Sequence, residues 1–416
     1  MARGVADTEM IRRTNRERVL DVIRREGPMS RSHIATLTGL SNASLSAIGS
    51  DLVAQGILSE IEDAQQESKG RGRPAIGLGH NRGAAYAILI ELDVNRCRLS
   101  MLDYGGVLVD RLETPLVPDQ FHLQQPDAYL LEKIAAMGRR NGIAMERLGI
   151  VAISVQGMLD PMRRGLKWSP IPALAGVDLL GPITESYGVP AHLYKRGHLM
   201  ADGTRWLHPA LVHATYATIF IGATIGMGLS FPSEGPLPAD IGTEFGHMNH
   251  MPDGALCRCG ARGCIEAYAA DYGVLRSAYS VPEHTTPASA VPPSDYQQII
   301  ARARAGDRSA IYAFNNAGSA LGFGINRLMS VVEISHIVLL GPGTAAFDLM
   351  RPAFEEATLA SLTGRINGVP QIILTADAGE PIYRGLMMKA LTALDRDHFA
   401  PMTATTARAD AEECRS

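Results

Sequence analysis

Three of the five cysteines in this 416-residue chain lie within eight residues, at Cys257, Cys259 and Cys264. Thiolates at the first, third and eighth positions of a glycine-containing loop can surround a tetrahedral cation, and His247, ten residues before the first of them, can supply the fourth ligand. Soft sulfur with one imidazole and no spare position favours a closed structural zinc site over a catalytic one. Buried or disulfide-linked cysteines are the alternative, but a C-x-C bridge is strained and the number is odd. The loop therefore predicts structural Zn²⁺.

The residues around this loop match a family signature. Glu244-Phe245-Gly246-His247 is followed, after nine residues, by Cys257-Arg258-Cys259-Gly260-Ala261-Arg262-Gly263-Cys264-Ile265-Glu266. This run resembles the ROK family of sugar kinases and sugar-responsive repressors, and the resemblance extends from about residue 10 to about residue 397. It implies an α/β, actin-like (hexokinase-like) two-lobed domain, here preceded by a winged helix-turn-helix domain.

Length and composition limit the class of protein to which this chain can belong. A chain of 416 residues suggests two or three domains with ample apolar content for their cores. The sequence has no run of eighteen apolar residues and its first residues lack an apolar signal core, so we expect a cytoplasmic protein with no membrane contact. A reduced compartment suits cysteines that serve as metal ligands. Cys97 is expected to be a core thiol and Cys414 a thiol in the tail.

The first eighty residues predict a DNA-binding module. Helices are expected at residues 10–25, 31–37 and 42–55. Glu26-Gly27-Pro28 ends the first helix, and Ser30 and Ser41 are suitable N-caps for the second and third. Leu37 is expected to face the core. A short strand near residues 57–61 then begins a wing and linker over 57–80, which completes a winged helix.

The exposed face of the third helix carries small polar residues that can approach base edges without steric or charge penalty. The expected DNA contacts are Arg31, Ser41, Asn42, Ser44, Ser46, Arg71 and Arg73. The last two belong to Gly70-Arg71-Gly72-Arg73-Pro74, which resembles an arm that enters the minor groove. A solvated linker is the alternative for this segment, and a small protein-interaction domain is the alternative for the whole module.

Two lobes are expected after residue 80. The first spans 81–200; the second spans 201–380 and includes the zinc loop, 247–264; a helix at 381–397 returns to the first lobe before a tail, 398–416. Strands are expected at 87–92, 99–102, 107–109, 148–155, 218–221, 336–340 and 371–375, with a further one entering at 189–190, and helices at 127–140 and 308–332. This alternation is the α/β rhythm of actin-like lobes.

Two kinase motifs of the family are altered. The resemblance places a D-x-G-x-T phosphate turn at Glu91-Leu92-Asp93-Val94-Asn95 and the E-N-D-x-N catalytic run at Tyr194-Lys195-Arg196-Gly197-His198. Arg196 therefore stands where the general base is expected, and a guanidinium cannot accept a proton; losing such a base costs roughly 10²–10⁴-fold in rate. A shifted register that brings Asp202 into the site is the alternative. The glycines of 222–228 and 341–343 are interpreted as structural rather than nucleotide-binding.

The resemblance implies sugar contacts from Glu244, His247 and Glu266. Lys195, Arg196 and His198 occupy the remaining corner, and their charge motivates the hypothesis of an anionic effector such as a phosphosugar or sugar acid. The alternative is that the two cations pair with Glu244 or Glu91 and fill the pocket. Glu244 and Glu266 would then only brace the zinc site.

The combined prediction is a sequence-specific DNA-binding transcriptional regulator, a repressor rather than an activator, with a non-catalytic sugar sensor. The expected partners are operator DNA, a sugar-type effector and a second copy of the chain in a homodimer, possibly a tetramer. Two recognition helices related by a two-fold axis would read a pseudo-palindrome. The competing interpretations are an active ATP-dependent sugar kinase with a DNA module and a zinc-stabilised interaction protein.

Overall fold

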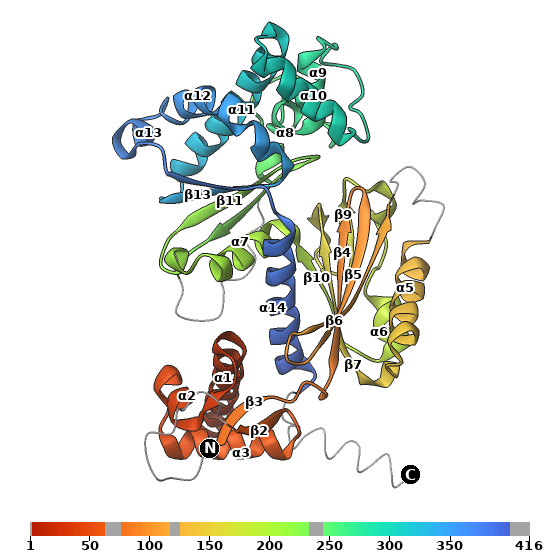
Figure 1. The fold of residues 1–416 in the computed structure, drawn as a ribbon, viewed down its shortest axis with the longest axis vertical. Helices are drawn as coiled ribbons and strands as arrows, with labels where there is room; N and C mark the ends of the chain where they lie inside the picture. The colour runs from red at the N-terminus through yellow and green to blue at the C-terminus, as the bar shows by residue number, and fades with distance from the viewer. Residues whose placement is uncertain (1, 63–75, 117–124, 233–243, 400–416) are drawn as a thin grey trace.

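The computed structural model describes residues 2–62, 76–116, 125–232 and 244–399. A small N-terminal module lies at one end of the long axis, and two α/β lobes make up the rest (Figure 1). Arg71, Arg73 and Cys414 fall outside the described residues. Within the described part of the chain, no helix combines the length and apolarity needed to cross a bilayer.

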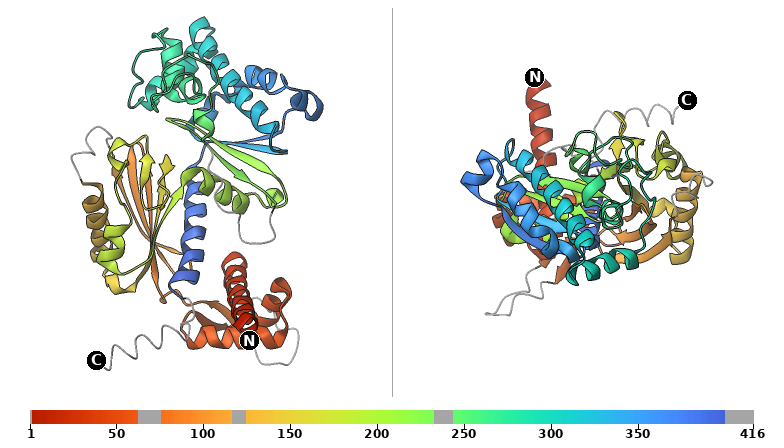
Figure 2. Two further views of the ribbon diagram at one scale, coloured as in Figure 1. Left: turned by 180° about the vertical axis from the view of Figure 1, so that it is seen from behind. Right: turned by 90° about the horizontal axis from the view of Figure 1, so that it is seen from above.

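The N-terminal module is a winged helix. Its elements are α1 (Ala2–Glu26), β1 (Met29–Ser30), α2 (Arg31–Thr38), α3 (Asn42–Ala54), β2 (Leu58–Glu62) and β3 (Ile76–His80). The strands form an antiparallel sheet in the order β1-β3-β2. The predicted caps are confirmed, because Ser30 Oγ accepts a hydrogen bond from His33 N at 3.4 Å and Ser41 Oγ accepts one from Ser44 N at 3.1 Å. The first helix begins earlier than predicted, and its N-terminal end extends beyond the rest of the molecule (Figure 2).

The prediction that Leu37 faces the core is wrong, since the side chain is 47% exposed. The buried residues of α2 are Ile34, Ala35 and Thr38. Positions 34, 35 and 38 share one side of a helix with 3.6 residues per turn, which places Leu37 on the adjacent, solvated side.

The first lobe is built on a five-stranded sheet in the order β10-β7-β4-β5-β6. Its strands are β4 (Tyr86–Asp93), β5 (Arg96–Asp103), β6 (Leu108–Pro115), β7 (Leu148–Val155) and β10 (Ala191–Lys195). Helices α5 (Pro126–Asn141) and α6 (Gly181–Tyr187) cover one face, and α14 (Gly379–Asp397) covers the other. Because both faces are covered, every residue of β7 is buried, which explains the continuous apolar run that predicted this strand. A separate hairpin, β8 (Met158–Leu159) and β9 (Leu166–Trp168), follows β7.

The second lobe has a four-stranded sheet in the order β12-β11-β13-β14. Its strands are β11 (Tyr216–Ile221), β12 (Ile225–Ser230), β13 (His336–Leu340) and β14 (Gln371–Thr375). Around it lie α7 (Arg196–Leu207), α8 (Glu266–Ala269), α9 (Asp271–Ala278), α10 (Pro293–Arg304), α11 (Arg308–Met329), α12 (Phe347–Thr358) and α13 (Leu362–Asn367). Most strands and helices predicted from apolar patterning overlap these elements. The strand expected at 107–109 extends from Leu108 to Pro115, the helix expected at 308–332 ends at Met329, and the strand expected at 189–190 begins at Ala191.

Helix α14 runs between the two lobes and reaches the N-terminal module (Figure 1). It crosses α7 at very short range. A Cβ at Gly203 would lie 1.8 Å from Pro381 O, and one at Gly385 would lie 2.1 Å from Leu199 O, so only glycine fits at either crossing point. The helix packs against β4 and β7 of the first lobe.

Candidate functional site

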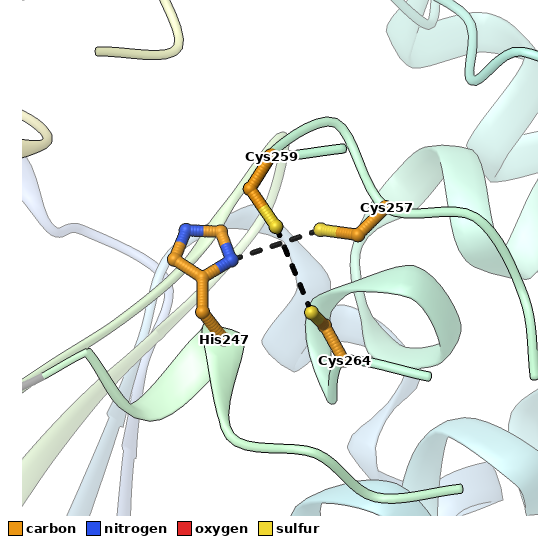
Figure 3. Close-up of side chains that lie close together, drawn as sticks. All are labelled: His247, Cys257, Cys259 and Cys264. Carbon is orange, nitrogen blue, oxygen red and sulfur yellow. Dashed lines mark hydrogen bonds between the residues drawn. The ribbon is translucent and has the colours of Figure 1, made fainter. Parts of the chain in front are cut away.

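The four predicted metal ligands lie together at the end of the second lobe's sheet (Figure 3). His247 ends the short 3₁₀ turn Phe245–His247, and the three cysteines come from the loop that precedes α8. Their ligand atoms all lie within 4.8 Å of one another. Cys259 Sγ is 3.7 Å from Cys264 Sγ, and Cys257 Sγ is 3.7 Å from His247 Nδ1. A tetrahedral ion with bonds of about 2.3 Å requires ligand separations of about 3.8 Å, so the cluster can hold a metal.

The loop backbone brings the sulfurs together. Gly260 and Gly263 have φ of 87° and 77°, and a Cβ at Gly263 would lie 1.7 Å from Met251 O. The neighbouring Cys264 sulfur, followed by burial, raises the pKa of Cys257 to about 12. A bound cation would lower this pKa, because a cysteine must be deprotonated to act as a metal ligand.

Two residues behind the cluster support it. Tyr272 Oη donates to Cys257 Sγ at 3.5 Å and to Glu266 Oε1 at 3.4 Å, and Ile225 N donates to Glu266 Oε2 at 3.1 Å. Glu266 is 2% exposed, so its carboxylate links the cysteine loop to the β11–β12 turn. Tyr272 was not predicted, because fifteen residues of helix and loop separate it from Cys257 and no local pattern signals the contact.

A cavity of about 60 Å³ adjoins the cluster and gathers every residue predicted to contact an effector. Those residues are Lys195, Arg196, His198, Glu244, His247 and Glu266. His247 turns Nδ1 toward Cys257, which leaves its second ring nitrogen directed away from the cysteines (Figure 3). One imidazole can therefore serve both the metal and the pocket.

Both cations of the pocket have carboxylate partners. Lys195 Nζ donates to Glu244 Oε1, which is one of the two alternative pairings expected from the sequence. Arg196 is buried, but it does not pair with Glu91 or Glu244; its Nη1 donates to Asp93 Oδ1 at 3.1 Å. Glu91 instead lies 3.6 Å from Arg98.

Arg196 also contacts the second lobe. Its Nη2 donates to Thr224 Oγ1 at 3.0 Å, and its guanidinium lies 4.2 Å from the centre of the Phe220 ring. Burial by itself raises the pKa of Asp93, but the charge of Arg196 and a hydrogen bond from Gln156 outweigh it, and the pKa falls below its usual value. Asp93 is therefore an ionised, fully engaged partner of the arginine.

A second cavity, of about 950 Å³, lies between the lobes on the other side of this pair. Asp93 and Phe220 line the large cavity, whereas Arg196, Gln156 and Thr224 line the small one. The hydrogen bonds that join these residues thus form a partition between the two spaces. Asp202 lines neither cavity; it pairs with Lys389 of α14 at 3.2 Å.

Of the residues predicted to contact DNA, those that the structure describes lie at the N-terminal ends of α2 and α3. Asn42, Ser44 and Ser46 are exposed on α3, and no residue of this helix is basic. Ser41 and Ser44 are hydrogen-bonded through their hydroxyls at 2.9 Å. Arg31 lies at the start of α2 and donates to Glu60 of the wing at 2.8 Å.

A two-lobed actin-like domain, with a His-Cys cluster that could hold a metal beside an interlobe pocket, defines the class of this protein. The family model described as "ROK family" matches residues 109–386, and the chain belongs to this family.

Named relatives and solved structures agree with that assignment. The chain is 26% identical over 345 residues to the xylose repressor of Bacillus subtilis, covering 80% of this chain and 84% of that protein. It is 24% identical over 358 residues to the transcriptional dual regulator NagC of Escherichia coli, covering 85% and 86%. A ROK transcriptional regulator described as a homologue of E. coli Mlc has a TM-score of 0.68 at 20% identity, covering 92% of this chain and 99% of that one. A ROK glucokinase from Streptomyces griseus, solved with glucose and AMPPNP, has a TM-score of 0.55 at 19% identity, covering 74% and 99%.

Proposed function

We propose that this chain is a sequence-specific transcriptional repressor whose ROK domain senses a sugar and does not transfer phosphate. The observation that carries the proposal is the ion pair of the buried Arg196 with Asp93, which divides the interlobe space of a domain that is joined to a winged helix. Relatives named as a repressor and as a transcriptional dual regulator, similar over most of the chain, support the regulatory role.

The absence of catalysis follows from the position of the arginine. Phosphoryl transfer requires the nucleotide and the acceptor hydroxyl in line and in contact. Arg196 lies between the two cavities, it cannot act as a base, and it is buried with a carboxylate partner, so leaving the partition would strand a charge on each side.

The effector we propose is an uncharged sugar. Lys195 and Arg196, which suggested an anionic ligand, are already neutralised by Glu244 and Asp93. An anionic effector would have to displace one of these carboxylates, whereas a neutral sugar needs only hydrogen-bond partners, which the pocket supplies through Glu244, His247 and Glu266.

Zinc in the Cys3His cluster would be structural, because four protein ligands complete its shell and leave no position for substrate.

We further propose a homodimer, possibly assembling into a tetramer, that binds a pseudo-palindromic operator. A sugar can change the affinity for DNA only to the extent that it binds one arrangement of the lobes more tightly than the other.

Gel shifts with DNA flanking the protein's own gene test the regulatory role. Specific binding should persist as salt is raised to levels that remove nonspecific binding, and sugar should change the affinity. An ATP-coupled assay over hexoses, pentoses and amino sugars tests the alternative. Appreciable turnover there would replace the repressor proposal with the kinase.

A further inference from the structure

Trp168, a residue that the signature motifs do not include, forms part of the pocket wall. It ends strand β9 of the β8–β9 hairpin, which belongs to the first lobe, yet its ring meets the His247 ring of the second lobe. The ring centroids are 5.0 Å apart and the planes are at 88°. Trp168 is therefore a contact across the mouth of the pocket between the hairpin and the metal centre.

The position of Trp168 is fixed by its backbone. Gly157 has φ of 122°, and a Cβ there would lie 2.1 Å from Trp168 O. Ser169, next in the chain, donates from Oγ to Gln156 O at 3.1 Å. The base of the hairpin is thus tied to the end of β7, while the outer residues Met158 and Met162 are 48% and 78% exposed. The ring is held at the pocket by a short, separate hairpin.

The pocket is lined by both polar and apolar side chains. The polar ones include the carboxylates and imidazoles already described. The apolar lining residues are Val155, Trp168, Pro170, Met200, Ile225, Met227 and Phe245. A sugar ring can use both kinds of neighbour, because its hydroxyls project around the rim while its axial C–H bonds form an apolar face, and the negative face of an aromatic ring attracts such polarised hydrogens. The small cavity has space for only a few water molecules, so a sugar must widen it.

We propose that Trp168 is the stacking surface for the effector and that it selects cyclic pyranoses with an unobstructed C–H face over open-chain polyols and sugar acids. This inference rests on the proposed sugar-sensing function. Binding would widen the space between Trp168 and the carboxylates and insert the sugar there, so the ring would change its surroundings when the effector binds.

The chain offers an internal reporter for this event, because Trp168 and Trp206 are its two tryptophans. Trp206 lies outside the pocket, with Arg25 4.9 Å from its ring centre, and Trp206→Phe keeps a ring there. In the full-length Trp206→Phe protein all tryptophan emission comes from Trp168. Titration with glucose, xylose, galactose and N-acetylglucosamine should change that emission, and the matched alditols and gluconate should bind at least tenfold more weakly.

Two variants at Trp168 distinguish the contribution of aromatic stacking from that of side-chain volume. By calorimetry, Trp168→Phe should keep the affinity within about threefold and Trp168→Leu should lower it by roughly 5- to 10-fold, as expected for loss of one aromatic contact. A single cooperative thermal transition in both variants would show that the fold is intact.

The possible failures are distinguishable. If calorimetry detects no sugar binding to the wild type, the sugar-sensing proposal itself fails and this inference fails with it. If sugars bind, but Trp168→Leu keeps full affinity and the emission of the Trp206→Phe protein does not respond, sensing stands and Trp168 has no part in it. Equal affinity for pyranoses and alditols would also overturn the stacking role.

Discussion

Arg24 of α1 and Asp395 of α14, 371 positions apart, form a two-point ion pair with N···O distances of 2.5 and 3.1 Å. Their side chains are only 3% and 5% exposed, and Tyr104 Oη donates to Asp395 Oδ1 at 2.7 Å. The pair joins the DNA-binding module to the helix whose other end, at Gly379 and Tyr383, lines the large interlobe cavity. Helix α14 therefore links the sensor lobes to the DNA module as one rigid element.

Breaking the Arg24–Asp395 ion pair should destabilise the protein strongly. Asp395→Asn leaves the Arg24 guanidinium buried without its counter-charge, and we expect a loss of about 3–5 kcal/mol in the free energy of unfolding. Urea unfolding of the two proteins measures it. Glu17→Gln, which removes the exposed Arg13–Glu17 pair, is the control and should cost less than about 1 kcal/mol. Equal losses of unfolding free energy in the two variants would contradict the stabilising role assigned to the Arg24–Asp395 pair.

His80, whose ring packs against Tyr104 beside the Arg24–Asp395 pair, should make the stability of the protein depend on pH. Burial, followed by the charge of Arg24, lowers the pKa of His80 to about 3. The unfolded chain binds the proton near pH 6.5 and the folded chain only near pH 3, so stability from this residue is complete above about pH 6.5 and falls as the pH drops toward 3, by up to about 1.4 kcal/mol per pH unit.

Urea unfolding between pH 7 and 4 should therefore show a shallower dependence for His80→Gln than for the wild type. The comparison of the two proteins cancels the contribution of the other histidines. Parallel curves would show that His80 titrates normally in the fold.

Asn42 should carry base recognition on α3. Among the described residues no partner is recorded for its exposed amide, and an Asn side chain can make two hydrogen bonds to adenine, worth about 1–3 kcal/mol. Asn42→Ala should weaken operator binding accordingly while leaving nonspecific binding and the salt dependence unchanged. Ser50→Ala, farther along the same helix, is the control. A uniform loss on all DNA sequences would assign Asn42 to the phosphate backbone instead.

Removing one metal ligand should remove the metal. Cys264→Ser should lower the zinc content from one ion per chain to near zero and reduce the melting temperature, because binding energy at a closed site contributes to folding. Cys97→Ala tests whether any buried cysteine has this effect, since Cys97 is buried in the first lobe, away from the cluster. Metal analysis and thermal melting measure both variants. Retention of stoichiometric zinc in Cys264→Ser would exclude the cluster as the site.

Features encoded by neighbouring residues could be predicted from the sequence. The spacing of Cys257, Cys259 and Cys264 specifies a chelating loop because so short a segment keeps its sulfurs close in any compact conformation. The helix caps at Ser30 and Ser41 depend on backbone groups three residues away, and the buried strand β7 is an uninterrupted apolar run. Each of these signals is complete within about ten residues.

The tertiary structure alone decided which distant charges meet. The sequence led us to expect Arg196 in the place of a base, with Glu244 or Glu91 as the alternative partners, but its partner in the structure is Asp93, 103 positions earlier. Likewise, Asp395 meets Arg24 because α14 reaches the N-terminal module, and Trp168 meets His247 because the β8–β9 hairpin of the first lobe reaches the second lobe. Side-chain charge and volume are properties of single residues, whereas the identity of a partner depends on how the whole chain packs, and no local pattern contains that information.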